Sequence, residues 1–312
     1  MSDAMTGGSR VAAPPRREKR RLLGRDGRAA YVFLAPWLIG LIGITLGPLL
    51  ASLVLSFSHY DLYNNPTWAG LDNYRQMLSD VSFIQSFDVT LTYVVVTVPT
   101  ILVISLALAM LLDRGLRGLT VYRALFYLPS LLGGSVAIAV LWRQVFGLNG
   151  MLNQILALVG IQGPSWIGQP STALYTLVAL NVWQFGATMI IFLAGLRQIP
   201  RHLYEAAEVD GAGGLRVFLS ITVPLLSPVI FFNGVLGLIR GFQVFTSAYI
   251  ISGGSGGPAG STLLYALYLY QQGFTDYNMG YAAGMAWVLL TLVAILTGLA
   301  FLSARYWVFY AD

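Results

Sequence analysis

Residues 197–227 read RQIPRHLYEAAEVDGAGGLRVFLSITVPLLS and separate two apolar stretches, Ala173–Leu196 and Pro228–Ile251. Each stretch exceeds twenty residues, which is enough for a helix to cross about 30 Å of hydrocarbon. The segment between them is too polar to cross a membrane itself. It therefore predicts a loop that joins two membrane-spanning helices.

The loop carries the pattern of two short helices. Pro200 suits the first turn of a helix, and good helix formers continue to Asp210, where Gly211 ends the pattern. A second helix is predicted from about Gly214 to Thr222, and two prolines then separate it from the next span. The loop is thus predicted to be a helix, a glycine turn and a second helix.

The composition of the whole chain predicts an all-α integral membrane protein. Hydrophobic residues make up 56% of its 312 residues, charged residues make up 10%, and the mean hydropathy is +0.70. A soluble chain of this length carries more charge. Six apolar segments are long enough to span, namely Tyr31–Leu55, Thr90–Leu112, Ala124–Leu141, Ala173–Leu196, Pro228–Ile251 and Gly280–Ser303. We therefore expect a basic tail (1–30), a six-helix transmembrane domain that contains the polar loop (31–303) and a short C-terminal segment (304–312).

The distribution of arginine predicts which side each loop faces, because basic loops stay in the cytoplasm. Residues 1–30 hold eight of the eighteen basic residues. With this tail in the cytoplasm, only Arg75 and Arg143 fall outside, and Arg240 lies within a span. The cytoplasmic side then also holds Arg114, Arg117, Arg123, Arg197, Arg201, Arg216 and Arg305. Both termini and the polar loop are therefore predicted to be cytoplasmic.

Outside the tail, the chain holds ten basic and ten acidic residues, so its positive charge does not predict a nucleic-acid surface. The tail is interpreted as a disordered flank that orients the chain, and a docking site for lipid or a partner is the alternative. Cysteine is absent, which excludes disulfides and thiolate chemistry. His59 and His202 stand apart in the sequence, and no metal site is predicted.

The first predicted loop helix has the residue types of a docking element. Ala206 and Ala207 have almost no side chain, so another surface can approach the backbone closely. Glu205, Glu208 and Asp210 offer carboxylates to a basic groove. The alternative is an amphipathic hairpin lying on lipid headgroups, and three acids beside an anionic membrane surface count against it.

The loop also resembles a known motif. Glu205-Ala206-Ala207, Asp210-Gly211-Ala212, Phe218, Ile221, Pro224 and Pro228 fill every position of the EAA loop of permease subunits from ATP-binding-cassette importers. The resemblance implies a type I ABC importer permease-like core in a bacterial inner membrane. It also implies that the residues coupling this chain to a separate ATPase are Glu205, Ala206, Ala207, Glu208, Asp210, Gly211, Ala212, Phe218 and Pro224.

Two further stretches resemble the carbohydrate branch of that family, the maltose and glycerol-3-phosphate type permeases. Residues 68–74, WAGLDNY, are similar to an aromatic-x-G-L-x-N-Y segment of the branch. Residues 242–245, FQVF, together with Tyr249 and the GYA run at 280–282, resemble its fifth and sixth spans. The chain departs from the branch at Thr246, where many relatives carry an acid. The branch implies uptake of a sugar or oligosaccharide.

The resemblance further implies a complex of several chains in membrane lipid. Its other members would be a second homologous permease, a cytoplasmic ATPase dimer and an extracytoplasmic substrate-binding protein. No G-x-x-x-x-G-K-[ST] run occurs in this sequence, so ATP and Mg are expected on the ATPase. The chain itself is predicted to bind no cofactor and to be non-catalytic. Closure of the ATPase would move the loop and switch the spans between inward-open and outward-open states.

Polar and aromatic residues within the apolar spans are the candidates for the solute path, because a polar group in a span usually faces a cavity or another helix. These candidates are Asn181, Trp183, Gln184, Asn233, Arg240, Gln243 and Tyr249. Amides and arginine hydrogen-bond hydroxyl groups, and aromatic rings stack on the apolar face of a sugar. For each residue the alternative is a hydrogen bond between helices. Gly133, Gly134, Ser135 and Ala137 indicate close helix packing.

Two other functions are alternatives to a sugar permease. A proton- or sodium-coupled transporter needs carboxylates or unwound helices in the membrane, yet all thirteen acids lie in loops, tails or span edges. The other alternative is a permease of the same family for a polyol, glycerol phosphate or a peptide. The sequence alone fixes neither the solute nor the permease partner.

Overall fold

The computed structural model describes residues 26–113 and 118–309, so the tail up to residue 25, Arg114 and Arg117 lie outside the described residues. The chain divides into two units, Met1–Ala51 and Ser52–Asp312. The first unit contains α1 (Asp26–Gly40), the π-helical turn η1 (Leu41–Leu46) and the first part of α2 (Gly47–Ser56). Together these segments form an apolar helix, Tyr31–Ser56, that is long enough to cross a membrane.

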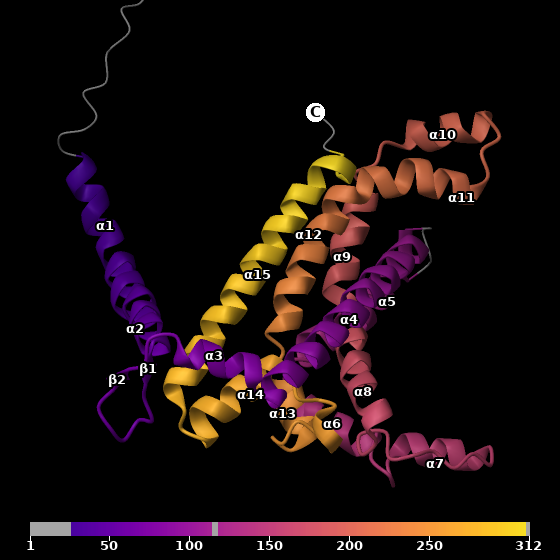
Figure 1. Cartoon of the computed structure of the whole chain (residues 1–312). Helices are drawn as coiled ribbons and strands as arrows, with labels where there is room; N and C mark the ends of the chain where they lie inside the picture. The colour runs from indigo at the N-terminus through magenta and orange to yellow at the C-terminus, as the bar shows by residue number, and fades with distance from the viewer. Residues whose placement is uncertain (1–25, 114–117, 310–312) are drawn as a thin grey trace, which may run out of the picture. The chain divides into compact units, whose positions relative to one another are not determined.

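Three more spanning helices lie in the second unit. They are α4 (Val81–Asp113), the continuous helix Gly214–Phe242 and α15 (Met279–Trp307). Gly214–Phe242 consists of α11 (Gly214–Val217), the π-helical turn η2 (Phe218–Thr222) and α12 (Val223–Phe242). Figure 1 shows α4, α12 and α15 side by side with α9.

Two further spans are bent pairs of helices. The pair α5 (Leu119–Leu132) and α6 (Val136–Val145) is bent by 100°, and the pair α8 (Pro170–Trp183) and α9 (Gly186–Leu196) by 46°. When each bent pair is counted as one span, the six predicted spans are confirmed. The all-α membrane fold is confirmed with them.

The remaining elements lie at the two ends of the second unit (Figure 1). The predicted loop helix α10 (Arg201–Val209) lies at one end, beside α11. The other end holds α3 (Asp72–Ser79), α7 (Met151–Leu158), α13 (Thr246–Ser252), η3 (Pro258–Gly260), α14 (Tyr265–Tyr270) and η4 (Gln271–Thr275). It also holds one small antiparallel hairpin of β1 (Ser58–His59) and β2 (Thr67–Trp68), in which Ser58 lies opposite Trp68.

The predicted break between the loop and the fifth span is absent. The helix runs on from Gly214 through Pro224 and Pro228 to Phe242, and it ends well before the predicted Ile251. A π-helical turn lies directly before Pro224, where the regular backbone bond cannot form because proline has no N–H. Ser227 Oγ donates to the Pro224 carbonyl at 2.6 Å, which satisfies the oxygen that Pro228 leaves free. The helix thus continues past both prolines, with a π-helical turn before Pro224 and the Ser227 hydrogen bond at Pro228.

The third predicted span, Ala124–Leu141, is not straight. It breaks between α5 and α6, where Ser135 begins the new helix and its side chain accepts a hydrogen bond from the Ile138 N–H at 3.3 Å. The predicted close packing holds for Gly133, because an added Cβ there would lie 2.1 Å from Gln184 Cδ. Gly134 has no atom of the described residues within 4 Å of such a Cβ. The glycines therefore mark a bend as well as a contact.

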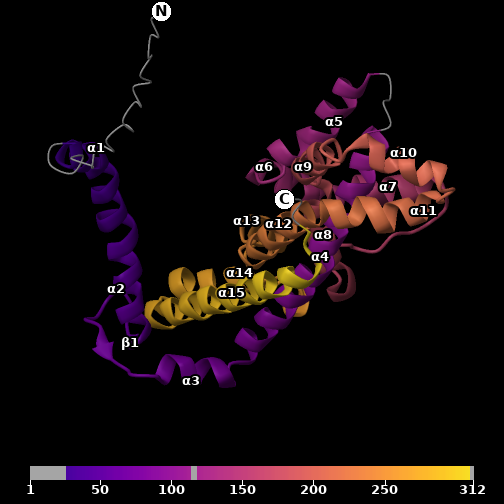
Figure 2. The same ribbon diagram turned by 90° about the horizontal axis from the view of Figure 1, so that it is seen from above.

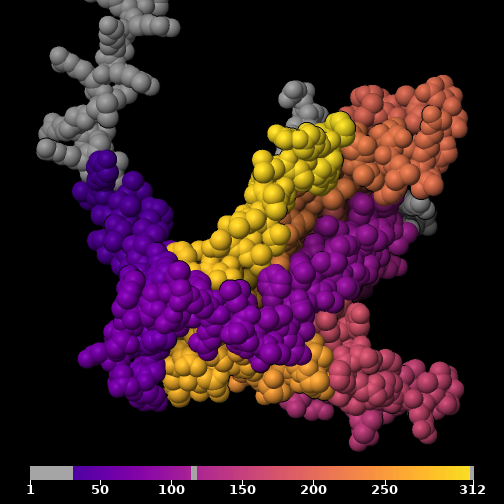
Figure 3. Space-filling view, in the orientation of Figure 1, coloured from indigo at the N-terminus to yellow at the C-terminus, as the bar shows by residue number. Residues whose placement is uncertain are grey.

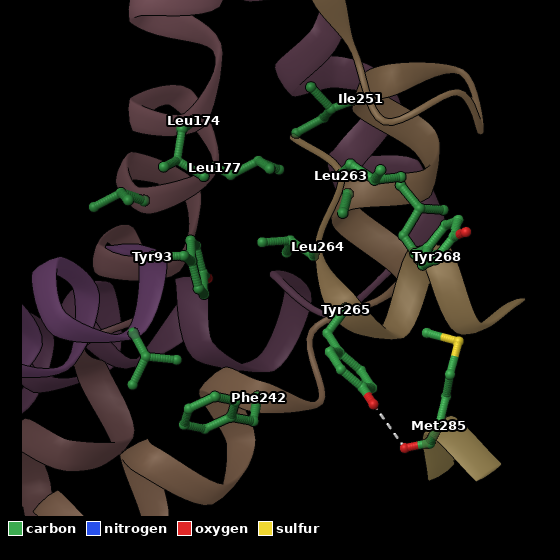
Figure 4. Packing of buried hydrophobic residues seen from close by; sticks show 14 of the residues in the cluster. Tyr93, Leu174, Leu177, Phe242, Ile251, Leu263, Leu264, Tyr265, Tyr268 and Met285 are labelled. Atoms are coloured by element: carbon green, nitrogen blue, oxygen red, sulfur yellow. Dashed lines mark hydrogen bonds between the residues drawn. The ribbon is translucent and has the colours of Figure 1, made fainter. Parts of the chain in front are cut away.

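Buried apolar side chains form two clusters in the described part of the second unit. One lies among α4, α8, α12, α14 and α15 and includes Tyr93, Leu177, Leu264, Tyr265 and Met285. Figure 4 shows Tyr93, Leu177 and Leu264 near one another, while Tyr265 points toward Met285 and its Oη donates to the Met285 carbonyl at 2.8 Å. The other cluster joins α4, α9 and α12 nearer to α10 and includes Ala109, Leu112, Met189, Phe192 and Leu226.

Asp80 ties three elements together at the end that holds α3 and α14. Its Oδ2 accepts hydrogen bonds from Tyr268 Oη at 2.5 Å and Tyr281 Oη at 2.7 Å, and its Oδ1 accepts from the Ser82 N–H at 2.9 Å. Burial raises the pKa of this carboxyl, but the tyrosine and backbone hydrogen bonds outweigh burial and hold the pKa below its ordinary value. Asp80 therefore stabilises the start of α4 in its ionised form.

The first prediction concerns the contact between α5 and α9. A Cβ at Gly186 would lie 2.2 Å from the Phe126 carbonyl oxygen, which belongs to the backbone and cannot rotate away. We expect Gly186→Ala to lower the stability of the purified protein by about 1–3 kcal/mol, because the two helices must separate. Thermal unfolding in detergent measures the effect. The matched control is Gly234→Ala, whose Cβ would meet only Leu102 Cδ1 at 3.8 Å. Equal losses in the two variants would contradict this account.

The second prediction concerns Asp80. Because its pKa is lowered on folding, its contribution to stability is present above the unfolded pKa of about 3.9 and is lost as the pH falls below that value. We expect Asp80→Asn to unfold at a lower temperature than the wild type at pH 7. The difference should shrink below about pH 4. A difference that stays constant from pH 7 to pH 3.5 would show that the charge of Asp80 is not involved.

Candidate functional site

The α10–α11 hairpin turns on a glycine. Pro200 is the N-cap of α10, and the helix ends in a Schellman motif at Gly211, whose φ is +69°. The Gly211 N–H donates to the Glu208 carbonyl at 3.0 Å, and the Ala212 N–H donates to the Ala207 carbonyl at 2.9 Å. A residue with a side chain is strained at this positive φ. The predicted first helix and glycine turn are therefore confirmed, and the second predicted helix is present as the start of the longer helix Gly214–Phe242.

One face of α10 packs on its own chain. Leu203 and Tyr204 contact the apolar cluster of α4, α9 and α12, and Tyr204 Oη lies 3.1 Å from Thr222 Oγ1. Ala207 is only 9% exposed, so its small side chain serves the contact between α10 and the chain itself. These contacts hold the hairpin at the end of the helices, where Figure 3 shows it, and Figure 2 shows α10 beside α11.

The opposite face of α10 carries acids. Glu205, Glu208 and Asp210 are exposed, and none of them forms an ion pair within the described residues. Ala206 is exposed beside them, and the apolar Val209 is 88% exposed. Three carboxylates around a solvent-exposed valine suit a partner that offers basic groups and an apolar contact.

A notch of about 430 Å³ lies between the two arms of the hairpin. Its lining consists of Ala207, Asp210, Ala212, Arg216, Val217, Ser220 and Ile221. Three predicted coupling residues, Ala207, Asp210 and Ala212, thus line the notch. Phe218 and Pro224 are half-buried in the helix that follows and lie outside it. The exposed surface of the hairpin thus combines acids and small residues with three exposed apolar side chains, Val209, Leu215 and Leu219.

A cavity of about 270 Å³ lies in the membrane-spanning part of the second unit, among α4, α5, α8, α9 and α12. Four of the predicted path residues line it, namely Asn181, Gln184, Asn233 and Arg240. The lining contains no aspartate or glutamate. The structure therefore brings together polar residues that the sequence placed in two separate spans.

Some polar groups of this cavity form hydrogen bonds within the chain, and Arg240 forms no ion pair with a described residue. Asn233 is 6% exposed and its Nδ2 donates to the Val229 carbonyl at 2.9 Å, while Gln184 Nε2 donates to the Leu180 carbonyl at 3.2 Å. The Arg240 side chain is exposed and forms no ion pair with any described residue. The cavity wall therefore offers fixed amides and one uncompensated positive charge, a combination that suits a neutral or anionic solute.

The other three path candidates lie outside this cavity. The Trp183 ring packs 5.7 Å from the Trp142 ring, and the Tyr249 ring lies 5.5 Å from the Tyr270 ring. Gln243 is the exposed C-cap of α12. Because the helix ends at Phe242, Gln243 and Tyr249 do not extend its cavity-lining face, although Val244 still lines the cavity.

Four hydroxyl residues of the cavity were missing from the sequence-based candidates: Tyr93, Thr97, Ser130 and Thr188. Hydroxyl groups carry a weak signal in an apolar segment, because serine and threonine commonly bond to carbonyls of their own helix. Only the spacing of Tyr93 and Thr97, one helical turn apart, indicates a shared face.

The chain is similar in sequence to known transport permeases. Residues 81–308 match the family described as binding-protein-dependent transport system inner membrane component. The probable ABC transporter permease YesP of Bacillus subtilis strain 168 is 49% identical over 295 residues, covering 94% of this chain and 96% of YesP. The lactose transport permease LacF of Rhizobium radiobacter is 34% identical, covering 88% of this chain and 93% of LacF.

The fold also matches a solved structure. A chain of a bacterial alginate ABC transporter, crystallised with its alginate-pentasaccharide-bound periplasmic protein, superposes with a TM-score of 0.76 at 20% identity. The match covers 90% of this chain and 95% of that one. The coverage and identities show that this multi-pass membrane protein belongs to the family of binding-protein-dependent transport system inner membrane components.

Proposed function

We propose that the chain is a permease subunit that moves a sugar or oligosaccharide inward, after an extracytoplasmic binding protein delivers it. A second permease subunit completes the path, and a cytoplasmic ATPase dimer binds ATP and Mg and supplies the energy. The observation that carries this proposal is the lining of the central cavity, which combines amides, hydroxyls and one unpaired arginine and holds no carboxylate.

The chemistry of that lining suits a solute rich in hydroxyl groups. Each sugar hydroxyl both donates and accepts, and amide, hydroxyl and guanidinium groups supply both kinds of partner. The similarity to a lactose permease and to an alginate transporter supports the same class of solute. A phosphorylated polyol is the second candidate, favoured by the unpaired charge of Arg240.

The same lining argues against coupling to protons or sodium. An ion-coupled transporter uses carboxylates in its spans to bind the coupling ion. No aspartate or glutamate lines this cavity, whereas three exposed acids gather on the hairpin. This distribution supports an energy source that docks at the hairpin.

The hairpin and the carboxyl end of the chain share one side. The Phe309 N–H donates to Ser227 Oγ at 2.9 Å, close to the start of α12 and to the hairpin. With the arginine-rich loops in the cytoplasm, this bond supports a cytoplasmic carboxyl terminus and a hairpin that faces the ATPase. The amino terminus is proposed to lie on the same side.

The third prediction tests the cavity. The subunit is co-purified with its partner permease, ATPase and binding protein, and reconstituted into proteoliposomes that are supplied with radiolabelled di- and oligosaccharides. We expect ATP-dependent uptake by the wild type and a KM about 10- to 100-fold higher for Arg240→Ala, because a charged hydrogen bond to solute is lost. Arg240→Lys should fall between them. Unchanged kinetics in Arg240→Ala would remove this residue from the path.

The fourth prediction tests the hairpin. Glu205→Lys replaces an exposed, unpaired carboxylate by a like charge for a basic partner surface, so it should weaken ATPase docking and abolish most ATP-driven uptake. Its membrane insertion and thermal stability should stay at wild-type values. The control is Gln198→Lys, which adds a lysine at an exposed position just before α10 and should retain uptake. Co-purification of the ATPase and uptake are measured together. Wild-type uptake in Glu205→Lys would count against docking through this face.

A further inference from the structure

Two hydroxyl groups on α4 stand out in the wall of the central cavity. Tyr93 is 0% exposed and Thr97 is 4% exposed, and both residues line the cavity. Their oxygen atoms are buried, and neither forms a well-oriented hydrogen bond with a described residue, although the two hydroxyls lie near each other. An unsatisfied buried hydroxyl destabilises a protein by about 1–3 kcal/mol. Even a contact between the two hydroxyls leaves one O–H without an acceptor, so the pair has hydrogen-bonding capacity that the described residues do not fill.

Other hydroxyls along α4 are satisfied by their surroundings. Thr90 Oγ1 donates to the Ser86 carbonyl at 2.7 Å, and Thr100 Oγ1 donates to the Val96 carbonyl at 2.6 Å. Ser105 Oγ donates to the Phe185 carbonyl at 3.2 Å. Thr97 has the same opportunity to bond back to its own helix, but no such bond forms. The unsatisfied oxygens on this helix thus coincide with its cavity-lining stretch.

Close packing fixes this stretch against α12. A Cβ at Gly241 would lie 2.9 Å from Val94 Cγ2, and a Cβ at Gly237 would lie 3.1 Å from Val98 Cγ1. Each valine follows one of the two hydroxyl residues, so contact with the glycines of α12 sets the rotation of α4. This rotation keeps Tyr93 and Thr97 on the wall that also carries Asn233 and Arg240 from α12.

We propose that Tyr93 and Thr97 form a hydroxyl subsite for a neutral, polyhydroxylated solute, on the α4 side of the cavity. The proposal rests on the proposed function of the cavity and adds a third helix to its binding surface. A sugar hydroxyl can accept from one of these groups and donate to the other, which an apolar solute or a cation cannot do. Because both oxygens are closed to water in this conformation, the wall must part by a side-chain rotation when solute enters.

A subsite of this kind distinguishes solutes because a solute without the matching hydroxyl binds more weakly. A solute that lacks the matching hydroxyl leaves the buried groups unpaired, and such sites discriminate strongly against it. The amides of Asn181 and Gln184 line the same cavity from α8 and its carboxyl end. The α4 hydroxyls would therefore bind sugar hydroxyls other than those that the amides bind.

The test uses Tyr93→Phe and Thr97→Val, which keep the shape of each side chain and remove only the ability to hydrogen-bond. In the reconstituted transporter, with the same radiolabelled di- and oligosaccharides, we expect each variant to raise the KM of uptake about fivefold to tenfold. Thermal unfolding of the purified complex should be unchanged or shifted to higher temperature, because an unsatisfied oxygen is removed. Thr100→Val is the control on the same helix, since its hydroxyl bonds to a carbonyl and lies outside the cavity lining.

The two readouts separate the outcomes. Lower thermal stability in Tyr93→Phe and Thr97→Val would show that the hydroxyls serve a structural hydrogen bond, and would overturn the subsite. Higher stability with wild-type KM values would show that the two hydroxyls are unpaired but do not contact the solute, and would overturn it as well. If the wild type takes up no sugar, the proposed function fails and the subsite fails with it. If only Arg240→Ala changes the KM, the proposed function stands and the subsite alone is rejected.

Discussion

The constraint on which this structure depends is the cost of an unpaired polar group in hydrocarbon. Water cannot satisfy backbone or side-chain groups within the membrane, so a spanning segment must bond to itself or to its neighbours. The chain meets this demand even at Pro228, where the Ser227 hydroxyl bonds to the free carbonyl. Irregular backbone at membrane depth is tolerated where it is buried in protein or lines a cavity. The break between α5 and α6 fits this rule, because Ser130 near its edge lines the central cavity.

The same cost distinguishes polar side chains that have a partner within the chain, and so serve the fold, from those that have none and are candidates for binding solute. Thr90, Thr100 and Ser105 bond to carbonyls, and their hydroxyls are therefore accounted for by the fold. Arg240 has no counter-charge among the described residues. Glycines serve packing alone. Gly237 and Gly241 let α4 approach α12 so closely that a side chain at either position would meet a valine of α4. Close contact on one face of α4 and a cavity on the next face follow from this arrangement.

The sequence predicted the six spans and the hairpin because both carry strong local signals. Length and hydropathy identify a span, and Gly211 followed by a second helix identifies the turn. The bends of the third and fourth spans were missed, since a glycine pair in an apolar run reads equally as close packing. The end of the fifth span was missed for a related reason, because the mostly apolar residues after Phe242 leave the helix and form a separate short helix, α13 (Thr246–Ser252). To predict which residues line the cavity, one must know how each helix is rotated about its axis. That rotation is set by tertiary contacts such as those of Val94 and Val98.

The continuity of one helix links the two sites. The sequence predicted a break between the hairpin and the fifth span, yet Gly214–Phe242 is a single helix of 29 residues. Such a helix is about 40 Å long at 1.5 Å per residue. It begins at the exposed hairpin and carries Asn233, Gly237 and Arg240 at the cavity. A displacement of the hairpin would therefore reach the cavity without passing through a loop, and the glycine contacts would transmit it to α4. The proposed coupling of ATP hydrolysis to solute movement requires such a connection between the hairpin and the cavity wall.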